Sequence, residues 1–139
     1  MGQQRFLYPR QRQIELLSAL YAGGFGLYCE ALTTAGARSP VYWVSDSIAV
    51  QHALAVVLLL AALVHALGIK INGSWRGSPV LRAIAMAAHT AVFAWLFSAA
   101  PGSSATYSYA WVMVFMAAGT INAARDSATA MGWRKWSLA

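Results

Sequence analysis

The chain has 139 residues, of which 59% are apolar and only 10% are charged, and its mean hydropathy is +0.52. Soluble domains carry about 25% charged residues, and a domain this small has no interior large enough to bury so much apolar surface. We therefore expect a membrane protein. The formal charge of +6 does not indicate nucleic-acid binding, because no basic stripe interleaved with aromatic residues is present. The single Cys29 excludes an internal disulfide and a cysteine metal cage.

Runs without charge predict the membrane-spanning helices, because a charged side chain at a bilayer centre costs about 2.5–3.5 kcal/mol. The run 47–69 is long enough for one span. The run 83–124 is nearly twice as long and is interrupted by the turn signal Pro101-Gly102-Ser103-Ser104. It therefore predicts two spans, over 79–100 and 107–124.

The first apolar segment is shorter, with only 14 uncharged residues between Glu15 and Glu30. That length fits either a span or the core of a signal peptide, for which the preceding arginines would form the basic region. We expect the segment to be retained as a helix over 13–35. The sequence thus predicts one all-α domain over 1–139, an integral membrane bundle of four transmembrane helices.

The basic residues predict the orientation of these spans. Of the ten Lys and Arg residues, Arg38 alone falls on one side of a four-span topology and the other nine fall on the opposite side. The positive-inside rule then places both termini and the loop before Pro79 in the cytoplasm. Aromatic residues at the span ends indicate interface belts, comprising Tyr42, Trp43, Tyr107, Tyr109 and Trp111 at the outer side and Tyr8, Trp75, Trp133 and Trp136 at the inner side.

Small residues at every fourth position allow helices to approach closely in lipid. Ala22 and Gly26 form such a pair in the first predicted span, and Ala83, Ala87 and Ala91 form a row in the third. We expect these residues to hold the four helices together rather than to bind a ligand.

Polar residues inside membrane spans are functional candidates by default. In the predicted spans they comprise Glu30, Gln51, His52, His65, His89 and Asn122. His65 and His89 stand twelve residues either side of Gly77, so an antiparallel hairpin brings them to similar depth. Two facing imidazoles are the axial ligands of a membrane haem b, so both residues are candidate cofactor ligands. There are two alternatives: the imidazoles take part in proton transfer or in a polar network, or they only form hydrogen bonds that satisfy their own buried nitrogens.

The helical step argues against the haem hypothesis. At 100° per residue, His89 points about 160° away from Ala87 and so leaves the small-residue face that is expected to pack. Glu30 is expected to be an interfacial anchor that Arg38 could reach as a surface pair.

Part of the first span resembles a known family. Tyr21-Ala22-Gly23-Gly24, then Glu30, then Thr33-Thr34 are similar to the first helix of small multidrug resistance transporters. In that family a membrane glutamate exchanges protons for a cationic drug. The resemblance implies a small proton-coupled transporter that uses Glu30.

The segments between spans carry a second resemblance. They resemble uncharacterised four-span membrane proteins of tailed phages and prophages at Ser39-Pro40-Val41-Tyr42, at Ile71-Asn72-Gly73-Ser74-Trp75-Arg76, at Ser78-Pro79-Val80-Leu81-Arg82 and at Ala123-Ala124-Arg125-Asp126. The resemblance implies an oligomerising phage-type protein of the bacterial inner membrane. Holin-like membrane permeabilisation is the most specific activity that it implies.

No catalytic constellation is present in the sequence. It contains no phosphate-binding glycine loop, nucleophile elbow, closely paired carboxylates or metal-binding His-Glu motif. We therefore expect a protein that is not an enzyme and holds no catalytic metal. Its expected partners are the lipid bilayer and either further copies of itself or another membrane protein.

Overall fold

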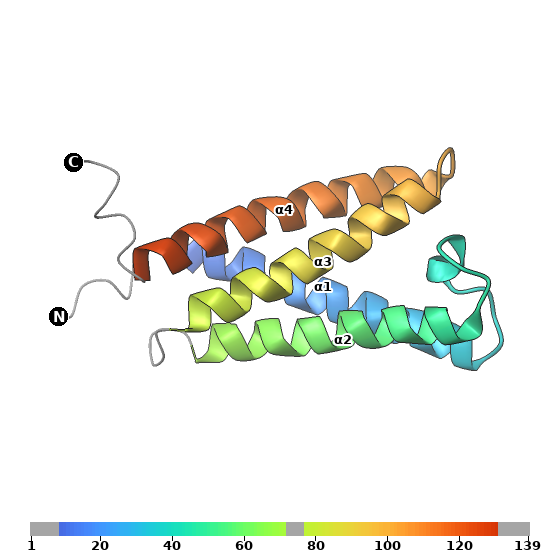
Figure 1. The fold of residues 1–139 in the computed structure, drawn as a ribbon, viewed down its shortest axis with the longest axis horizontal. Coiled ribbons are helices and arrows are strands. Elements are labelled where there is room, and N and C mark those ends of the chain that lie inside the picture. Colours follow the sequence, from blue (N-terminus) through green and yellow to red (C-terminus); the bar gives the residue numbers. More distant parts are fainter. Residues whose placement is uncertain (1–8, 72–76, 131–139) are drawn as a thin grey trace.

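The computed structural model describes residues 9–71 and 77–130, and all regular structure in these ranges is helical. The elements are α1 (Pro9–Thr34), the short 3-10 helix η2 (Pro40–Trp43), α2 (Ile48–Lys70), α3 (Ser78–Ala99) and α4 (Ser104–Ala130). The four α-helices run alternately up and down one long axis (Figure 1). The start of α1, the end of α2, the start of α3 and the end of α4 lie at one end, here called the terminal end; the opposite end is the η2 end. The all-α prediction with four helices is confirmed.

The two middle helices match the predicted spans to within one residue at each end. α1 begins earlier than expected, at Pro9, and α4 extends from Ser104 to Ala130 rather than over 107–124. The difference at α4 has a simple reason. A charge-free run ends at Arg125, whereas an α-helix can continue through charged residues that are exposed or paired, as Arg125 and Asp126 are.

Glycines in the left-handed conformation end two of the helices. Gly36 follows α1 with a φ of 68°, and the N–H of Ala37 donates to the carbonyl of Leu32 at 2.9 Å, as in the usual glycine-terminated helix. Gly102 has a φ of 75° in the turn between α3 and α4. The predicted turn at Pro101-Gly102-Ser103-Ser104 is therefore confirmed.

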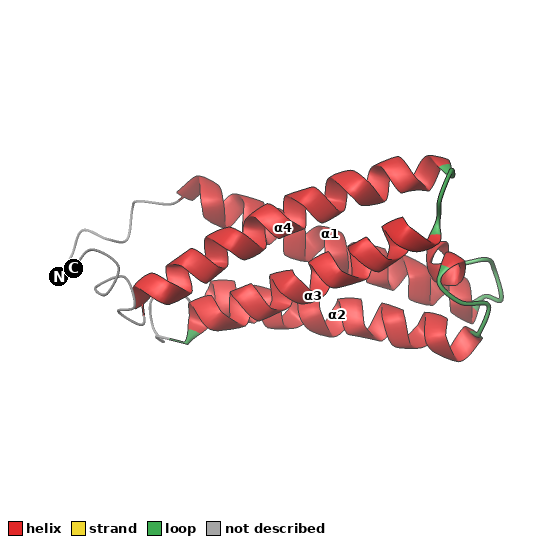
Figure 2. Ribbon diagram, turned by 45° about the horizontal axis from the view of Figure 1, so that its top comes forward, coloured by secondary structure: helices red, strands yellow, loops and turns green. Residues whose placement is uncertain are grey.

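The bundle consists of two antiparallel hairpins. α1 packs mainly against α2, α3 packs against α4, and α2 and α3 join the hairpins, whereas α1 and α4 make few contacts (Figure 2). An apolar groove of about 450 Å³ lies between α1 and α4, lined by Leu17, Leu20, Tyr21, Val112, Phe115 and Met116. The bundle is thus closed along the α2–α3 seam and open along the α1–α4 side.

Small residues bring α1 close to α2, as the sequence predicts. Ala22 has no exposed surface, and Gly26 is buried. A Cβ atom added to Gly26 would stand 3.1–3.2 Å from Leu58, Leu59 and the carbonyl oxygen of Ala55. Little space therefore remains for a larger residue at this crossing.

The alanine row of α3 lies differently from the expectation. Ala83 is half-buried, but Ala87 and Ala91 are exposed. α3 packs through the opposite face, which carries the buried residues Arg82, Ala85, Met86, His89, Phe93 and Leu96. The longer side chains bury more area than a row of methyl groups, and they determine which face turns inward.

Most of the outward surface along α2 and α3 is apolar. α2 and α3 are long and apolar enough to cross a membrane, and only 33% and 39% of their most apolar windows are buried in the bundle. Every exposed residue of α2 between Ala53 and Ile69 is apolar, and so is every exposed residue of α3 between Leu81 and Phe97. Large exposed apolar side chains also occur on the outer helices, including Leu16, Leu20 and Leu27 of α1 and Trp111, Phe115 and Ile121 of α4.

The expected aromatic belt is present in part at the η2 end. Trp43, Tyr107 and Trp111 are exposed there. Tyr109 is buried in the bundle and packs against Phe93, so it does not belong to a surface belt. The aromatic residues expected at the other side, Tyr8, Trp75, Trp133 and Trp136, lie outside the described residues.

Candidate functional site: the polar interior

The interior of the bundle carries a set of polar and charged groups, whereas the exposed residues along the middle of α2 and α3 are apolar. The buried polar and charged residues include Glu15, Ser18, Gln51, His65, Ser78, Arg82, His89 and Ser127. These groups lie within a core that also contains buried apolar residues such as Leu58, Phe93 and Met116. The ionisable members of this set, with Glu30, His52 and Asp126, make up the candidate site.

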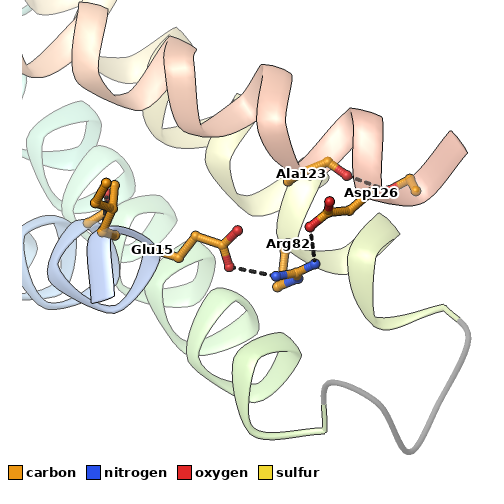
Figure 3. A network of polar contacts seen from close by, with 7 residues as sticks. Glu15, Arg82, Ala123 and Asp126 are labelled. Atoms are coloured by element: carbon orange, nitrogen blue, oxygen red, sulfur yellow. Dashed lines mark hydrogen bonds and ion pairs between the residues drawn. The ribbon is translucent and has the colours of Figure 1, made fainter. Parts of the chain in front are cut away.

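Arg82 links three helices near the terminal end (Figure 3). Its Nη1 donates a hydrogen bond to Oε2 of Glu15 on α1 at 2.8 Å, and its Nη2 donates to Oδ2 of Asp126 on α4 at 3.1 Å. Glu15 and Arg82 are buried, while the Asp126 side chain is 34% exposed. We call these residues the Arg82 trio. The trio joins α1 to α4 near the terminal end, although these two helices make few other contacts with each other.

His65 of α2 and His89 of α3 lie side by side in the bundle and form what we call the histidine pair. Their ring centroids are 5.8 Å apart, with 50° between the ring planes, and neither residue has exposed surface. Within the described ranges, none of the four ring nitrogens has a hydrogen-bond partner. The predicted common depth is confirmed. His89 lies on the face through which α3 packs. The expectation that it points away from the packing face is therefore wrong.

The histidine pair does not fit a haem b. A porphyrin held by both imidazoles must lie between the two rings and extend beyond them on every side. Neither ring has any exposed area, so no water-sized space adjoins them, and α2 packs directly on α3. The described residues also contain no group of three or more His, Cys, Asp or Glu that could hold a metal ion. The expected role of His65 and His89 as haem ligands therefore has no support in the packing.

Glu30 binds a different partner from the one expected. Both of its carboxylate oxygens lie 2.9 Å from Nδ1 of His52, across the α1–α2 interface, and the hydroxyl of Thr34 donates to Oε1 at 3.5 Å. The His52 and Glu30 side chains are 37% and 34% exposed. Arg38 lies over the Tyr42 ring at 3.7 Å instead of pairing with Glu30. The Glu30–His52 pair thus connects two helices near the η2 end.

The two remaining polar candidates, Gln51 and Asn122, lie apart from the charged groups of the site. Gln51 is buried, and its side-chain N–H donates to the carbonyl of Ser45 at 3.1 Å, which ties the start of α2 to the preceding loop. Asn122 is exposed on α4. Neither residue contacts the histidine pair or the Arg82 trio through a hydrogen bond within the described chain.

An aromatic layer lies between the two ends of the polar interior. It consists of Tyr21 and Phe25 of α1, Phe93 of α3 and Tyr109 of α4, whose neighbouring ring centroids are 5.4–6.4 Å apart. Phe93 follows His89 by about one helical turn, and Phe25 precedes Glu30 by a little more than one turn. The layer therefore separates the histidine pair and the Arg82 trio from the Glu30–His52 pair.

Sequence reasoning missed the Arg82 trio. Glu15 marked only the start of a charge-free run there, and Arg82 and Asp126 were named only within the segments of the second resemblance. A usable signal was nevertheless present. In a four-span topology all three residues fall at the same side of the membrane, and opposite charges at the same depth of neighbouring helices tend to pair.

Comparisons with known proteins give no family for this chain. No protein-family model matches it, and neither the curated proteins nor the solved structures contain a match.

Proposed function

We propose that all four helices cross a bacterial inner membrane, with the terminal end of the bundle in the cytoplasm. α1 and α4 have 26 and 27 residues. At 1.5 Å per residue they are about 40 Å long, enough for a hydrocarbon core of about 30 Å. Their exposed apolar side chains support the same environment as those of α2 and α3. Lys70 and Arg125 at the terminal end, against Arg38 at the η2 end, support this orientation.

We further propose that the protein translocates protons across this membrane. The observation that carries the proposal is the Arg82 trio, a buried cation between two carboxylates inside a bundle with an apolar surface. Ionisable residues at such positions are costly and typically mark proton or ion pathways. Two acidic partners suit a proton carrier, because either carboxylate can take up a proton while the other still neutralises Arg82.

Partly exposed titratable groups lie at both ends of the proposed path. Asp126 is accessible at the terminal end, and the Glu30–His52 pair is accessible near the η2 end. The aromatic layer lies between them. This arrangement favours stepwise proton transfer with a conformational change over an open water-filled channel. The role of Glu30 agrees with the transporter resemblance of α1.

Holin-like permeabilisation has less support from the geometry. A water-filled lesion between copies of the chain requires polar surfaces that face the water. The exposed residues of α2 and α3 are apolar along nearly their whole length. Self-association remains a prediction that does not depend on this activity.

Proton flux into liposomes tests the proposal. The protein is reconstituted with a pH-sensitive dye inside the vesicles, and a pH gradient is imposed with potassium and valinomycin to compensate charge. We expect the wild-type protein to dissipate the gradient and Asp126→Asn to reduce the rate at least tenfold. The matched control is Asn122→Ala, an exposed position on the same helix one turn away, which should retain the wild-type rate.

Two results would contradict proton translocation. One is a gradient that persists with correctly inserted wild-type protein. The other is release of a large trapped dye together with the protons, which would show non-selective permeabilisation and return the holin-like activity to first place.

A further inference from the structure

We propose that His65 and His89 form a binding site for one soft monovalent cation, Cu(I) or Ag(I), held between one nitrogen of each ring. The site goes beyond proton translocation and does not depend on it. The histidine pair is separate from the groups assigned to proton uptake and release, since no hydrogen bond joins it to the Arg82 trio or to the Glu30–His52 pair within the described ranges.

The unpaired nitrogens are the first support. Buried polar side-chain atoms in proteins nearly always have a hydrogen-bond partner, so four buried nitrogens without one at a single place require an explanation. A neutral imidazole has one nitrogen with a free lone pair, which is the atom that binds a metal. Two such rings therefore offer two metal-binding lone pairs in a place from which water is excluded.

The separation of the rings is the second support. Metal–imidazole bonds are about 2 Å long. Two of them in line, together with about 1.1 Å from each nitrogen to its ring centre, span about 6.2 Å between centroids, which is within about half an ångström of the observed 5.8 Å. A bare ion is smaller than a water molecule and far smaller than a porphyrin. His65 and His89 have no exposed surface, which leaves no room for haem b. A bare ion between the two rings does not need that room.

The number of ligands selects the class of ion. Zn²⁺ in proteins is almost always four-coordinate, and Mg²⁺ and Ca²⁺ require six or more oxygen ligands. No third His, Cys, Asp or Glu joins the histidine pair within the described part of the chain. Cu(I) and Ag(I) accept two nearly opposite ligands, and imidazole is a suitable ligand for copper. The pair sits on two adjacent helices that pack directly, which holds the two ligands at a fixed distance.

Cu(I) binding is measured on the full chain in nanodiscs, under a reductant and without oxygen, in competition with the chromophoric chelator bicinchoninate. We expect one Cu(I) per chain, with His65→Gln and His89→Gln each weakening the affinity at least tenfold. The matched control is Cys29→Ser, because Cys29 is the one thiol of the chain and the strongest competing ligand for Cu(I). This variant should bind Cu(I) as the wild-type protein does.

A direct measurement keeps the proposal testable if the glutamine variants do not fold. X-ray absorption of the Cu(I)-loaded wild-type protein should show two nitrogen neighbours at about 2 Å and no sulfur neighbour. Sulfur ligation, loss of binding in Cys29→Ser, or unchanged affinity in folded histidine variants would each overturn the site. Because Asp126→Asn should leave copper binding unchanged, failure of proton translocation and failure of this site are distinguishable.

Discussion

Gly68 of α2 lies directly against the side-chain stem of Arg82 on α3. A Cβ atom added to Gly68 would stand 2.9 Å from Cγ of Arg82 and 3.5 Å from its backbone nitrogen. The neighbouring atom belongs to the stem of the arginine rather than to its flexible tip, so it cannot move aside without moving the guanidinium. The missing side chain of Gly68 is thus what allows Arg82 to lie between Glu15 and Asp126.

We predict that Gly68→Ala destabilises the bundle and disturbs the Arg82 trio. Overpacking of this kind typically costs about 1–3 kcal/mol. The free energy of unfolding, measured in mixed micelles, should fall by that amount and the proton flux should fall with it. Gly24→Ala is the control, since nothing lies within 4 Å of a Cβ atom there. Equal stability of the two variants would show that α2 and α3 are not in close contact at this point.

Replacing one residue of the Arg82 trio at a time should lower the free energy of unfolding strongly. Arg82→Met removes the buried cation that donates hydrogen bonds to both carboxylates, and breaking a buried ion pair in this way costs about 3–5 kcal/mol. Replacing Glu15, Arg82 and Asp126 together by apolar residues of similar size should recover most of that loss. The comparison is made by unfolding the two variants under the same conditions. A triple variant as unstable as Arg82→Met would contradict this assignment.

The Glu30–His52 pair should contribute little to stability and more to function. Because both side chains are about one third exposed, the pair resembles a surface ion pair, which is worth about 0–1 kcal/mol. Glu30→Gln should therefore unfold within about 1 kcal/mol of the wild-type protein while its proton flux falls at least tenfold. If Glu30→Gln keeps the full proton flux, Glu30 is not part of the proton path and acts only as an interfacial anchor.

Large residues should distinguish the two small-residue rows. Gly26→Leu places a side chain where α1 meets α2, and we expect a loss of about 1–3 kcal/mol. Ala87→Leu points outward from α3 and should change the stability by less than about 0.5 kcal/mol. Chemical cross-linking in membranes then reports self-association. A loss of oligomers in Ala87→Leu at unchanged monomer stability would identify this row as a contact between copies.

Much of the fold follows from the sequence because its long apolar runs have clear boundaries. The ends of α2 are predicted to within a residue because charged residues bound its apolar run, and the ends of α3 are predicted because Pro79 and the turn at Pro101 bound that helix. The Pro101-Gly102 turn is predicted because its chemistry is local. The common depth of His65 and His89 follows from the symmetry of the α2–α3 hairpin alone.

The rotation of each helix could not be predicted in the same way. The alanine row of α3 suggested that Ala87 faces its neighbours, but Met86, His89 and Phe93 turn that face outward. The partners of the charged residues depend on this rotation. Arg82 therefore meets Glu15 and Asp126 only once three helices are placed in space. Likewise, Arg38 stacks on Tyr42 although Glu30 was its expected partner.

The crossing of the membrane by all four helices is tested most directly by labelling single cysteines in spheroplasts with a membrane-impermeant maleimide. On a Cys29→Ser background, Arg38→Cys and Ser103→Cys probe the η2 end, and Lys70→Cys probes the terminal end. We predict that the first two variants are labelled in intact spheroplasts and that Lys70→Cys is labelled only after permeabilisation. Labelling of Lys70→Cys in intact spheroplasts together with Arg38→Cys, or protection of both Arg38→Cys and Ser103→Cys, would contradict the four-span bundle.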